Sequence, residues 1–163
     1  MKKVLVVMGS DSDLKVMEKC VDRLKSFDIP TEVRICSAHR TPAVAESLAK
    51  NAADDGFGVI IAAAGKAAHL GGVLAAYTTL PVIGVPMATS VMGGMDSLLS
   101  IVQMPKGIPV ASVAIDGADN AAILAAQMLA ISDETLAAKL AHFKADMADE
   151  VVAKDEKIKA QFE

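Results

Sequence analysis

Three short segments of the sequence hold side chains that could bind and transform a small ligand. The first, MGSDSD at positions 8–13, offers hydroxyls and carboxylates beside free backbone N–H groups that open a helix. Hydroxyl and N–H groups suit a phosphate, and a carboxylate suits the diol of a ribose. Ser and Asp are also preferred helix caps, so a purely structural role stays open. The candidate ligand-binding residues here are Ser10, Ser12 and Asp13.

The second segment, SAHRTP at positions 37–42, precedes another expected helix and contains Ser37, His39 and Arg40. Arg40 can hold a phosphate through two parallel hydrogen bonds, and His39 can exchange protons near neutral pH. A single His or Arg in a loop is more often a solvated surface residue. Together with a serine at the end of a strand, the two favour a functional site.

The third segment, AAAGKAAHLGG at positions 62–72, has Gly65 where the backbone could approach a ligand and His69 one turn into an expected helix. His69 alone fits a core histidine as well as a catalytic one. The two histidines lie in different segments without a carboxylate cluster, so we expect no metal site. Fingerprints of nicotinamide enzymes, nucleoside triphosphatases, zinc proteases and serine hydrolases are missing from the sequence.

The hydrophobic pattern predicts how these segments are brought together. Short apolar runs predict five strands, and each is followed by a segment with a helical pattern. Alternating strands and helices with short connections predict a parallel, doubly wound sheet in a three-layer, flavodoxin-like α/β sandwich. Ligands of such sheets bind at the carboxyl ends of the strands, where the three segments should meet. The expected strands span 3–8, 31–36, 57–63, 82–85 and 109–115, and the expected helices span 14–29, 42–55, 67–77, 96–104 and 118–131.

The last thirty residues have a different character. Residues 133–162 are rich in charge and predict one long helix with an apolar stripe. We expect this extra C-terminal helix either to cross its own domain or to pack on a neighbouring subunit. The chain is therefore a single domain, 1–163, with its core at about 3–131. The stripe consists of Leu136, Leu140, Phe143, Met147 and Val151.

Composition limits the possible partners. The formal charge is −4, which disfavours binding to nucleic acid. Hydrophobic residues make up 53% of the 163 residues, an excess that favours a homo-oligomer. Cys20 and Cys36 lack CxxC spacing and no secretory leader precedes them, so we expect reduced thiols and a cytoplasmic protein. The uncharged stretch 67–95 contains several Gly and Pro residues, so it should not span a membrane.

The motifs MGSDSD, SAHRTP, AGKAAHL and GMDSLLSIVQMPKGIPVASVAI resemble the PurE family in type and order, over about residues 3–131. The resemblance implies a mutase of purine biosynthesis that converts N5-carboxyaminoimidazole ribonucleotide to 4-carboxy-5-aminoimidazole ribonucleotide. It further implies that carbon dioxide is released and recaptured in a closed pocket, that no cofactor is needed, and that the protein is an octamer. A dry, close-fitting pocket lined by small residues suits such a step.

The resemblance also implies a role for each motif residue. His39 is the expected general acid and base. The phosphate and ribose contacts are expected from Ser10, Ser12, Asp13, Ser37 and Arg40. The pocket around the migrating carboxylate is expected from Gly65, Ala67, Ala68, His69 and Leu70.

Two positions depart from the family pattern. Lys66 stands where the bacterial mutases usually have Gly, and Gly71 stands where they have Pro. We expect Lys66 to be a solvated residue at the rim of the pocket, with the alternative that it adds positive charge near the carboxylate.

Other functions remain as alternatives. A second PurE class carboxylates aminoimidazole ribonucleotide directly, but it has SAHK for SAHR and Ser-Asn in place of the Ala-His pair, so Arg40, Ala68 and His69 favour the mutase. A related synthase that carboxylates nicotinic acid adenine dinucleotide usually carries an additional N-terminal region. A non-enzymatic phosphate-binding or receiver module is disfavoured, because a receiver needs an aspartate where residues 62–65 read AAAG.

Overall fold

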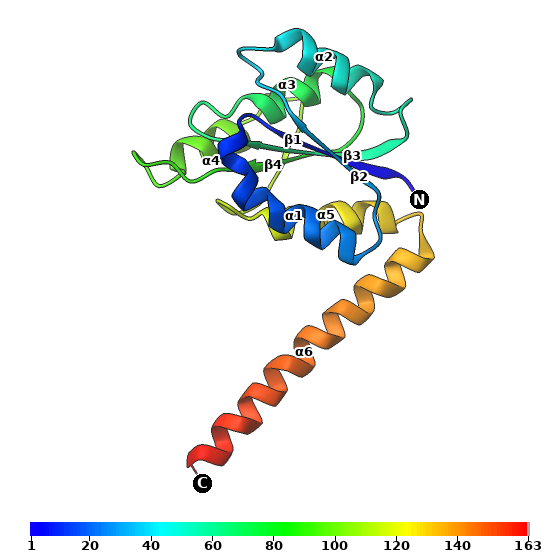
Figure 1. Cartoon of the computed structure of the whole chain (residues 1–163), viewed down its shortest axis with the longest axis vertical. Coiled ribbons are helices and arrows are strands. Elements are labelled where there is room, and N and C mark those ends of the chain that lie inside the picture. The colour runs from blue at the N-terminus through cyan, green and yellow to red at the C-terminus, as the bar shows by residue number, and fades with distance from the viewer. Residues whose placement is uncertain (163) are drawn as a thin grey trace.

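A five-stranded parallel sheet in the order β2-β1-β3-β4-β5 forms the centre of the molecule (Figure 1). The computed structural model describes residues 1–162. The strand order reverses between β1 and β3, which defines the doubly wound, flavodoxin-like topology that the sequence predicts. The strands are β1 (Lys3–Met8), β2 (Thr31–Ile35), β3 (Phe57–Ala64), β4 (Val82–Pro86) and β5 (Ala111–Ser112).

Helices cover both faces of the sheet and complete the three layers. Helices α1 and α5 pack together on one face, and α2 and α3 pack together on the other (Figure 1). A short 3₁₀ helix, η1, precedes α1. The helices are η1 (Asp11–Asp13), α1 (Leu14–Ser26), α2 (Pro42–Asn51), α3 (Leu70–Tyr77), α4 (Met95–Val102), α5 (Ala118–Ala130) and α6 (Glu134–Phe162).

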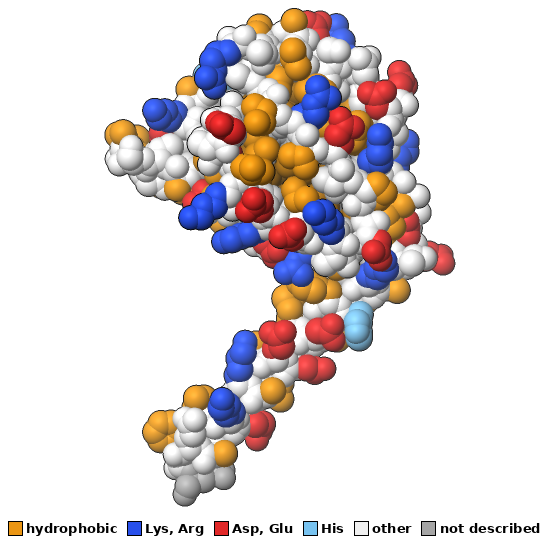
Figure 2. Space-filling model, viewed as in Figure 1, with side chains coloured by type: hydrophobic (Ala, Val, Ile, Leu, Met, Phe, Trp, Pro, Cys, Tyr) orange, Lys and Arg blue, Asp and Glu red, His pale blue; other side chains and the backbone are white. Residues whose placement is uncertain are grey.

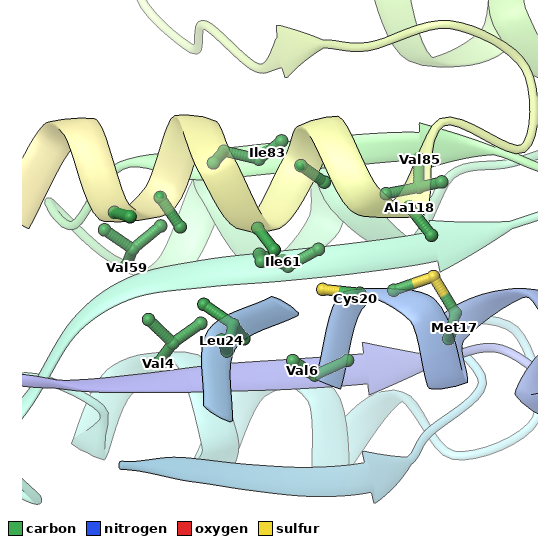
Figure 3. Close-up of a cluster of buried hydrophobic side chains, with 14 of the residues drawn as sticks. Val4, Val6, Met17, Cys20, Leu24, Val59, Ile61, Ile83, Val85 and Ala118 are labelled. Carbon is green, nitrogen blue, oxygen red and sulfur yellow. The ribbon is translucent and has the colours of Figure 1, made fainter. Parts of the chain in front are cut away.

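Burial on both faces explains why the sequences of the central strands β1, β3 and β4 are almost continuously apolar. Val4 and Val6 of β1 point into the core beneath α1 and α5, together with Ile61 of β3 (Figure 3). Their neighbours Leu5 and Val7 belong to the second core, beneath α2 and α3. Because successive side chains alternate between the faces, β1, β3 and β4 each contribute to both cores, whereas the edge strand β2 has no buried side chain.

Several element boundaries differ from the predicted ones, and the helix predicted at 14–29 ends at Ser26. The strand predicted at 109–115 pairs only at Ala111 and Ser112. Pro109 has no N–H to donate, which disfavours pairing at the start of the predicted strand. The helix predicted from Ala67 begins at Leu70, because Lys66 adopts a left-handed backbone with φ of 57°. The helix predicted to end at 55 ends at Asn51, and η1 was not predicted.

The C-terminal helix α6 is only partly packed on its own domain. Leu136 is fully buried, and the Phe143 ring meets Phe27 edge to face with centroids 5.5 Å apart. Beyond Met147 the helix projects away from the sandwich, and Val151 and Phe162 are exposed (Figures 1 and 2). Within residues 1–162, no helix is both long and apolar enough to cross a membrane.

Candidate active site

The loops that follow the first four strands line one cavity of about 460 Å³. They meet there because β1 to β4 are parallel, so their carboxyl ends share one edge of the sheet. The three motifs singled out in the sequence supply most of the wall. The lining residues are Gly9, Ser10, Ser12, Asp13, Ser37, Ala38, His39, Arg40, Ala64, Gly65, Lys66, Ala67, His69, Leu70, Met87, Ala88, Thr89 and Ser90.

The loop after β1 carries a small network of hydroxyls at the start of η1. The Ser10 Oγ accepts a hydrogen bond from the Ser12 N–H at 3.3 Å and from the Ser12 hydroxyl at 3.0 Å. Ser10 is thus a helix cap, and it lines the cavity as well. The helix-capping and ligand-binding interpretations of this motif are compatible, because a capping hydroxyl can rotate toward an anion.

Asp13 is the buried carboxylate of the cavity. Only 9% of its surface is exposed, and the Ser12 hydroxyl donates to its Oδ1 at 3.4 Å. Burial raises the pKa of Asp13, opposed by hydrogen bonds from Ser12 and Ser10, while the charges of Asp116 and Asp11 raise it further. Because desolvation is the largest effect, ionised Asp13 gains by accepting hydrogen bonds from a ligand.

The loop after β2 is closed by Thr41. Its hydroxyl donates to the Ser37 carbonyl at 2.9 Å and accepts from the Ser37 N–H at 3.0 Å. Thr41 therefore precedes α2 without capping it through its side chain. Arg40 bridges two loops, with Nε 3.4 Å from Ser37 Oγ and Nη2 3.4 Å from the Gly9 carbonyl.

The loop after β3 is held from α4. The buried Ser97 accepts a hydrogen bond from the Lys66 N–H at 2.9 Å, and Ser100 donates to the Lys66 carbonyl at 3.3 Å. Gly65 does not have a left-handed backbone, and an added Cβ would lie 3.5 Å from Met87, which is ordinary contact. The fold therefore has room for a side chain at Gly65. Such a side chain would instead occupy space that a close-fitting ligand in the cavity needs.

The two histidines meet across the loops. Nε2 of His39 lies 2.9 Å from Nδ1 of His69, with the rings nearly perpendicular at 77°. His69 precedes the first residue of α3, rather than lying one turn inside the helix. Within residues 1–162, no group of three His, Cys, Asp or Glu side chains could hold a metal ion.

Of the eleven residues predicted for the site, the structure places ten around the cavity. Ala68 is the exception, because it is buried beneath the loop in the core that α2 and α3 cover. The wall contributed by the loop after β4 was not predicted from the sequence; it consists of Met87, Ala88, Thr89 and Ser90. These residues carry no charge or imidazole, but their place at the end of a parallel strand was a usable signal. Nothing in the structure explains Gly71 in place of Pro.

A hydrogen-bonded histidine pair facing a guanidinium and a buried carboxylate at the strand ends defines an α/β enzyme for a small, polar substrate. Residues 3–150 match the model of the AIR carboxylase family, so the chain belongs to this family. N5-carboxyaminoimidazole ribonucleotide mutase of Methanocaldococcus jannaschii is 52% identical over 98% of this chain and 99% of that protein.

Two further comparisons agree. The Mycobacterium leprae protein with the same name is 56% identical over 94% of this chain and 90% of its own length. The crystal structure of Treponema denticola PurE superposes with a TM-score of 0.87 at 30% identity, covering 94% of this chain and 96% of that one. Sequence and fold comparisons thus point to one family.

Proposed function

We propose that the protein converts N5-carboxyaminoimidazole ribonucleotide to 4-carboxy-5-aminoimidazole ribonucleotide, as the names of its relatives describe for them. The observation that supports this most is the contact between His39 and His69 inside the cavity formed by the three motif loops. A proton carrier in a cavity with small lining residues suits a transfer of carbon dioxide within one molecule.

The polar side chains around the cavity suggest how the ribonucleotide lies. Arg40 and the hydroxyls of Ser10, Ser12 and Ser37 would bind its phosphate, because a guanidinium and hydroxyls donate to anionic oxygens. Asp13 would accept hydrogen bonds from the ribose hydroxyls. The base would then lie toward His39 and the loop after β3.

The carboxylate would move in the pocket formed by Gly65, Ala67, His69 and Leu70, with Ala68 supporting the loop from below. The bond between the exocyclic nitrogen and the carboxyl carbon breaks, carbon dioxide leaves, and the nitrogen takes a proton from His39. The adjacent ring carbon then attacks carbon dioxide, and His39 takes back the proton from that carbon. One proton is given and one recovered, so the isomerisation balances without a cofactor or co-reactant.

Direct carboxylation of aminoimidazole ribonucleotide is the second candidate, because the matching family model is described as AIR carboxylase. Purified protein should be incubated separately with the carbamate substrate and with the free amine plus bicarbonate. Ultraviolet absorbance then follows the carboxylated product. Fast turnover of the carbamate alone supports the mutase, and fast turnover of the amine supports the carboxylase. With turnover of neither, the protein would be a phosphate-binding module.

The proposed enzyme works as a homo-octamer in the cytoplasm. Support for assembly comes from α6, whose second half exposes Val151, Ile158 and Phe162 away from its own domain (Figure 2). We propose that this half packs on a neighbouring subunit. An apolar groove of about 580 Å³ between α5 and α6 adds further surface, and it includes Ser112, whose buried hydroxyl has no partner within residues 1–162. The buried, free thiols of Cys20 and Cys36 suit a reducing compartment.

A further inference from the structure

The fourth wall of the cavity lies where the sheet gives little support. Strand β5 pairs with β4 only at Ile83–Ala111 and Gly84–Ser112, so the end of β4 has no regular ladder on that side. The wall, Met87 to Ser90, continues directly from this end of β4. On the β3 side it is held by the Met87 N–H, which donates to the Ala64 carbonyl at 3.0 Å.

Asp116, in the loop between β5 and α5, takes the place of the missing ladder. Its N–H donates to the Pro86 carbonyl at 2.8 Å, and its carboxylate accepts from the Ala88 N–H at 2.8 Å. These two bonds bracket Met87, the first residue of the wall. A charged acceptor makes the second bond stronger than an ordinary ladder bond.

The backbone at Asp116 is shaped for this contact. Its φ is 56°, a left-handed conformation that Asp and Asn adopt more readily than other residues with a side chain. The preceding Ile115 packs against Gly94, where an added Cβ would lie 2.7 Å from Ile115 Cγ2 and 3.2 Å from Ala88 Cα. The loops after β4 and β5 therefore fit together closely at the wall.

We propose that Asp116 is a positioning residue, which holds the β4 wall against the cavity and so keeps carbon dioxide enclosed between its release and its recapture. This inference rests on the proposed function. The Asp116 charge also acts on the site, since it contributes to the raised pKa of Asp13, after burial and against the hydrogen bonds of Ser12 and Ser10. Asp116 thus links the wall to the buried carboxylate.

The test measures how turnover divides between carboxylated product and escaped carbon dioxide. Each enzyme is given the carbamate substrate, and product and free aminoimidazole ribonucleotide are both measured after subtraction of the uncatalysed decay. Asp116→Gly removes the carboxylate without opposing the left-handed backbone. It should release more free amine per product and lower kcat/KM by about tenfold, the size of effect that a lost positioning bond produces. Asp116→Ala should divide turnover in the same way.

Two further variants separate positioning from stability. Asp116→Asn keeps an acceptor for the Ala88 N–H and tolerates the backbone, so it should restore most of the enclosure. Asp119→Ala removes a neighbouring aspartate, which pairs with Arg23 at 2.8 Å outside the cavity lining. This variant should leave the ratio of free amine to carboxylated product unchanged. The inference would be overturned if Asp116→Gly gave the same ratio of free amine to carboxylated product as the wild type. It would also be overturned if Asp116→Asn released as much free amine per product as Asp116→Gly. Absence of product with wild-type enzyme would instead refute the proposed function.

Discussion

His39 and His69 stand 30 residues apart in the sequence, yet their rings share a hydrogen bond of 2.9 Å between Nε2 and Nδ1. Such a bond needs one donor and one acceptor, so it couples the tautomers of the two rings: the shared proton is held by Nε2 of His39 or by Nδ1 of His69. While this bond is made, Nε2 of His39 has no second proton or lone pair to offer. For Nε2 to exchange a proton with the substrate in the proposed reaction, the substrate must therefore replace His69 as its partner.

The first prediction separates the two histidines. His39→Asn should preserve fold and substrate binding but lower kcat by about 10²–10⁴-fold, since Asn forms hydrogen bonds but does not exchange protons near pH 7. His69→Asn should cost less, because the proposed role of His69 is orientation and pocket shape. Steady-state kinetics with measured substrate affinity decides between them. Near-normal turnover for His39→Asn with an inactive His69→Asn would reverse the roles.

The second prediction concerns the phosphate. Arg40→Ala should weaken binding of the ribonucleotide by about 10- to 100-fold, because a charge-assisted hydrogen bond is lost. Binding of the corresponding nucleoside should change little, since it lacks the phosphate. Calorimetric titration of both ligands gives the comparison. Equal losses for the two ligands would remove Arg40 from the phosphate site.

The third prediction links stability to function at Asp13. Burial raises the pKa of Asp13 in the folded protein above its value in the unfolded chain. The protonated carboxyl therefore favours folding, and this contribution to stability is lost as the pH rises through the folded pKa. Asp13→Asn should therefore raise the thermal midpoint at pH 7, and the gain should shrink below about pH 4. Binding of ribonucleotide and nucleoside should both weaken.

Melting curves across this pH range test the stability of the Asp13 variant. The matched control is Asp22→Asn, an exposed aspartate of α1 that lies 3.9 Å from Lys25, and it should change the midpoint little at any pH. A lower midpoint for Asp13→Asn at pH 7 would show that the carboxylate is structurally required in the free enzyme.

The sequence predicted the sheet because its signals are local. Apolar runs such as 3–8 and 57–63 determine strand positions, and short connections determine parallel order, so three motif loops could be assigned to one edge. The contact between His39 and His69 could not be predicted, because it depends on two loop conformations. The backbone of Lys66 illustrates this: it has a left-handed conformation, and its N–H donates to Ser97 while its carbonyl accepts from Ser100, 31 and 34 residues away.

The wall after β4 was missed for a different reason. Met87 to Ser90 have no charged side chain that would mark a site in the sequence. Their support comes from Asp116, which lies in a segment that the sequence pattern placed directly after a longer fifth strand. The end of β5 depends on tertiary contacts rather than on its β-branched sequence, because intrinsic strand propensity is a weak determinant.

The fourth prediction tests the departure at Lys66. With φ of 57°, Lys66→Gly should stabilise the fold by up to about 1 kcal/mol, because glycine adopts this conformation without steric cost. Turnover should stay close to wild type if the ammonium is solvated at the rim, as we expect. Denaturant unfolding and kinetics are measured beside Lys66→Ala, which lacks the ammonium but keeps the backbone burden. A loss of turnover shared by both variants would place the ammonium on the substrate.

The fifth prediction concerns assembly through α6. Removal of residues 148–163 retains Leu136 and Phe143, which pack on the domain core, and deletes Val151, Ile158 and Phe162, which are exposed. The shortened chain should therefore fold but associate more weakly, because burial of apolar surface between subunits is lost. Light scattering at micromolar concentration measures the mass of wild-type and shortened proteins.

Point substitutions show whether the apolar stripe of α6 causes this association. Ile158 continues the stripe, because it lies about two helical turns beyond Val151. Ile158→Asp therefore places a charge on this face and should weaken assembly as the truncation does, because an unpaired charge is costly to bury. Lys157→Asp changes charge at the adjacent exposed position and should leave the oligomer intact. A monomeric wild-type protein, or an unchanged oligomer after truncation, would contradict the proposed packing of α6 on a neighbour. Equal weakening by both substitutions would attribute the effect to charge rather than to the stripe.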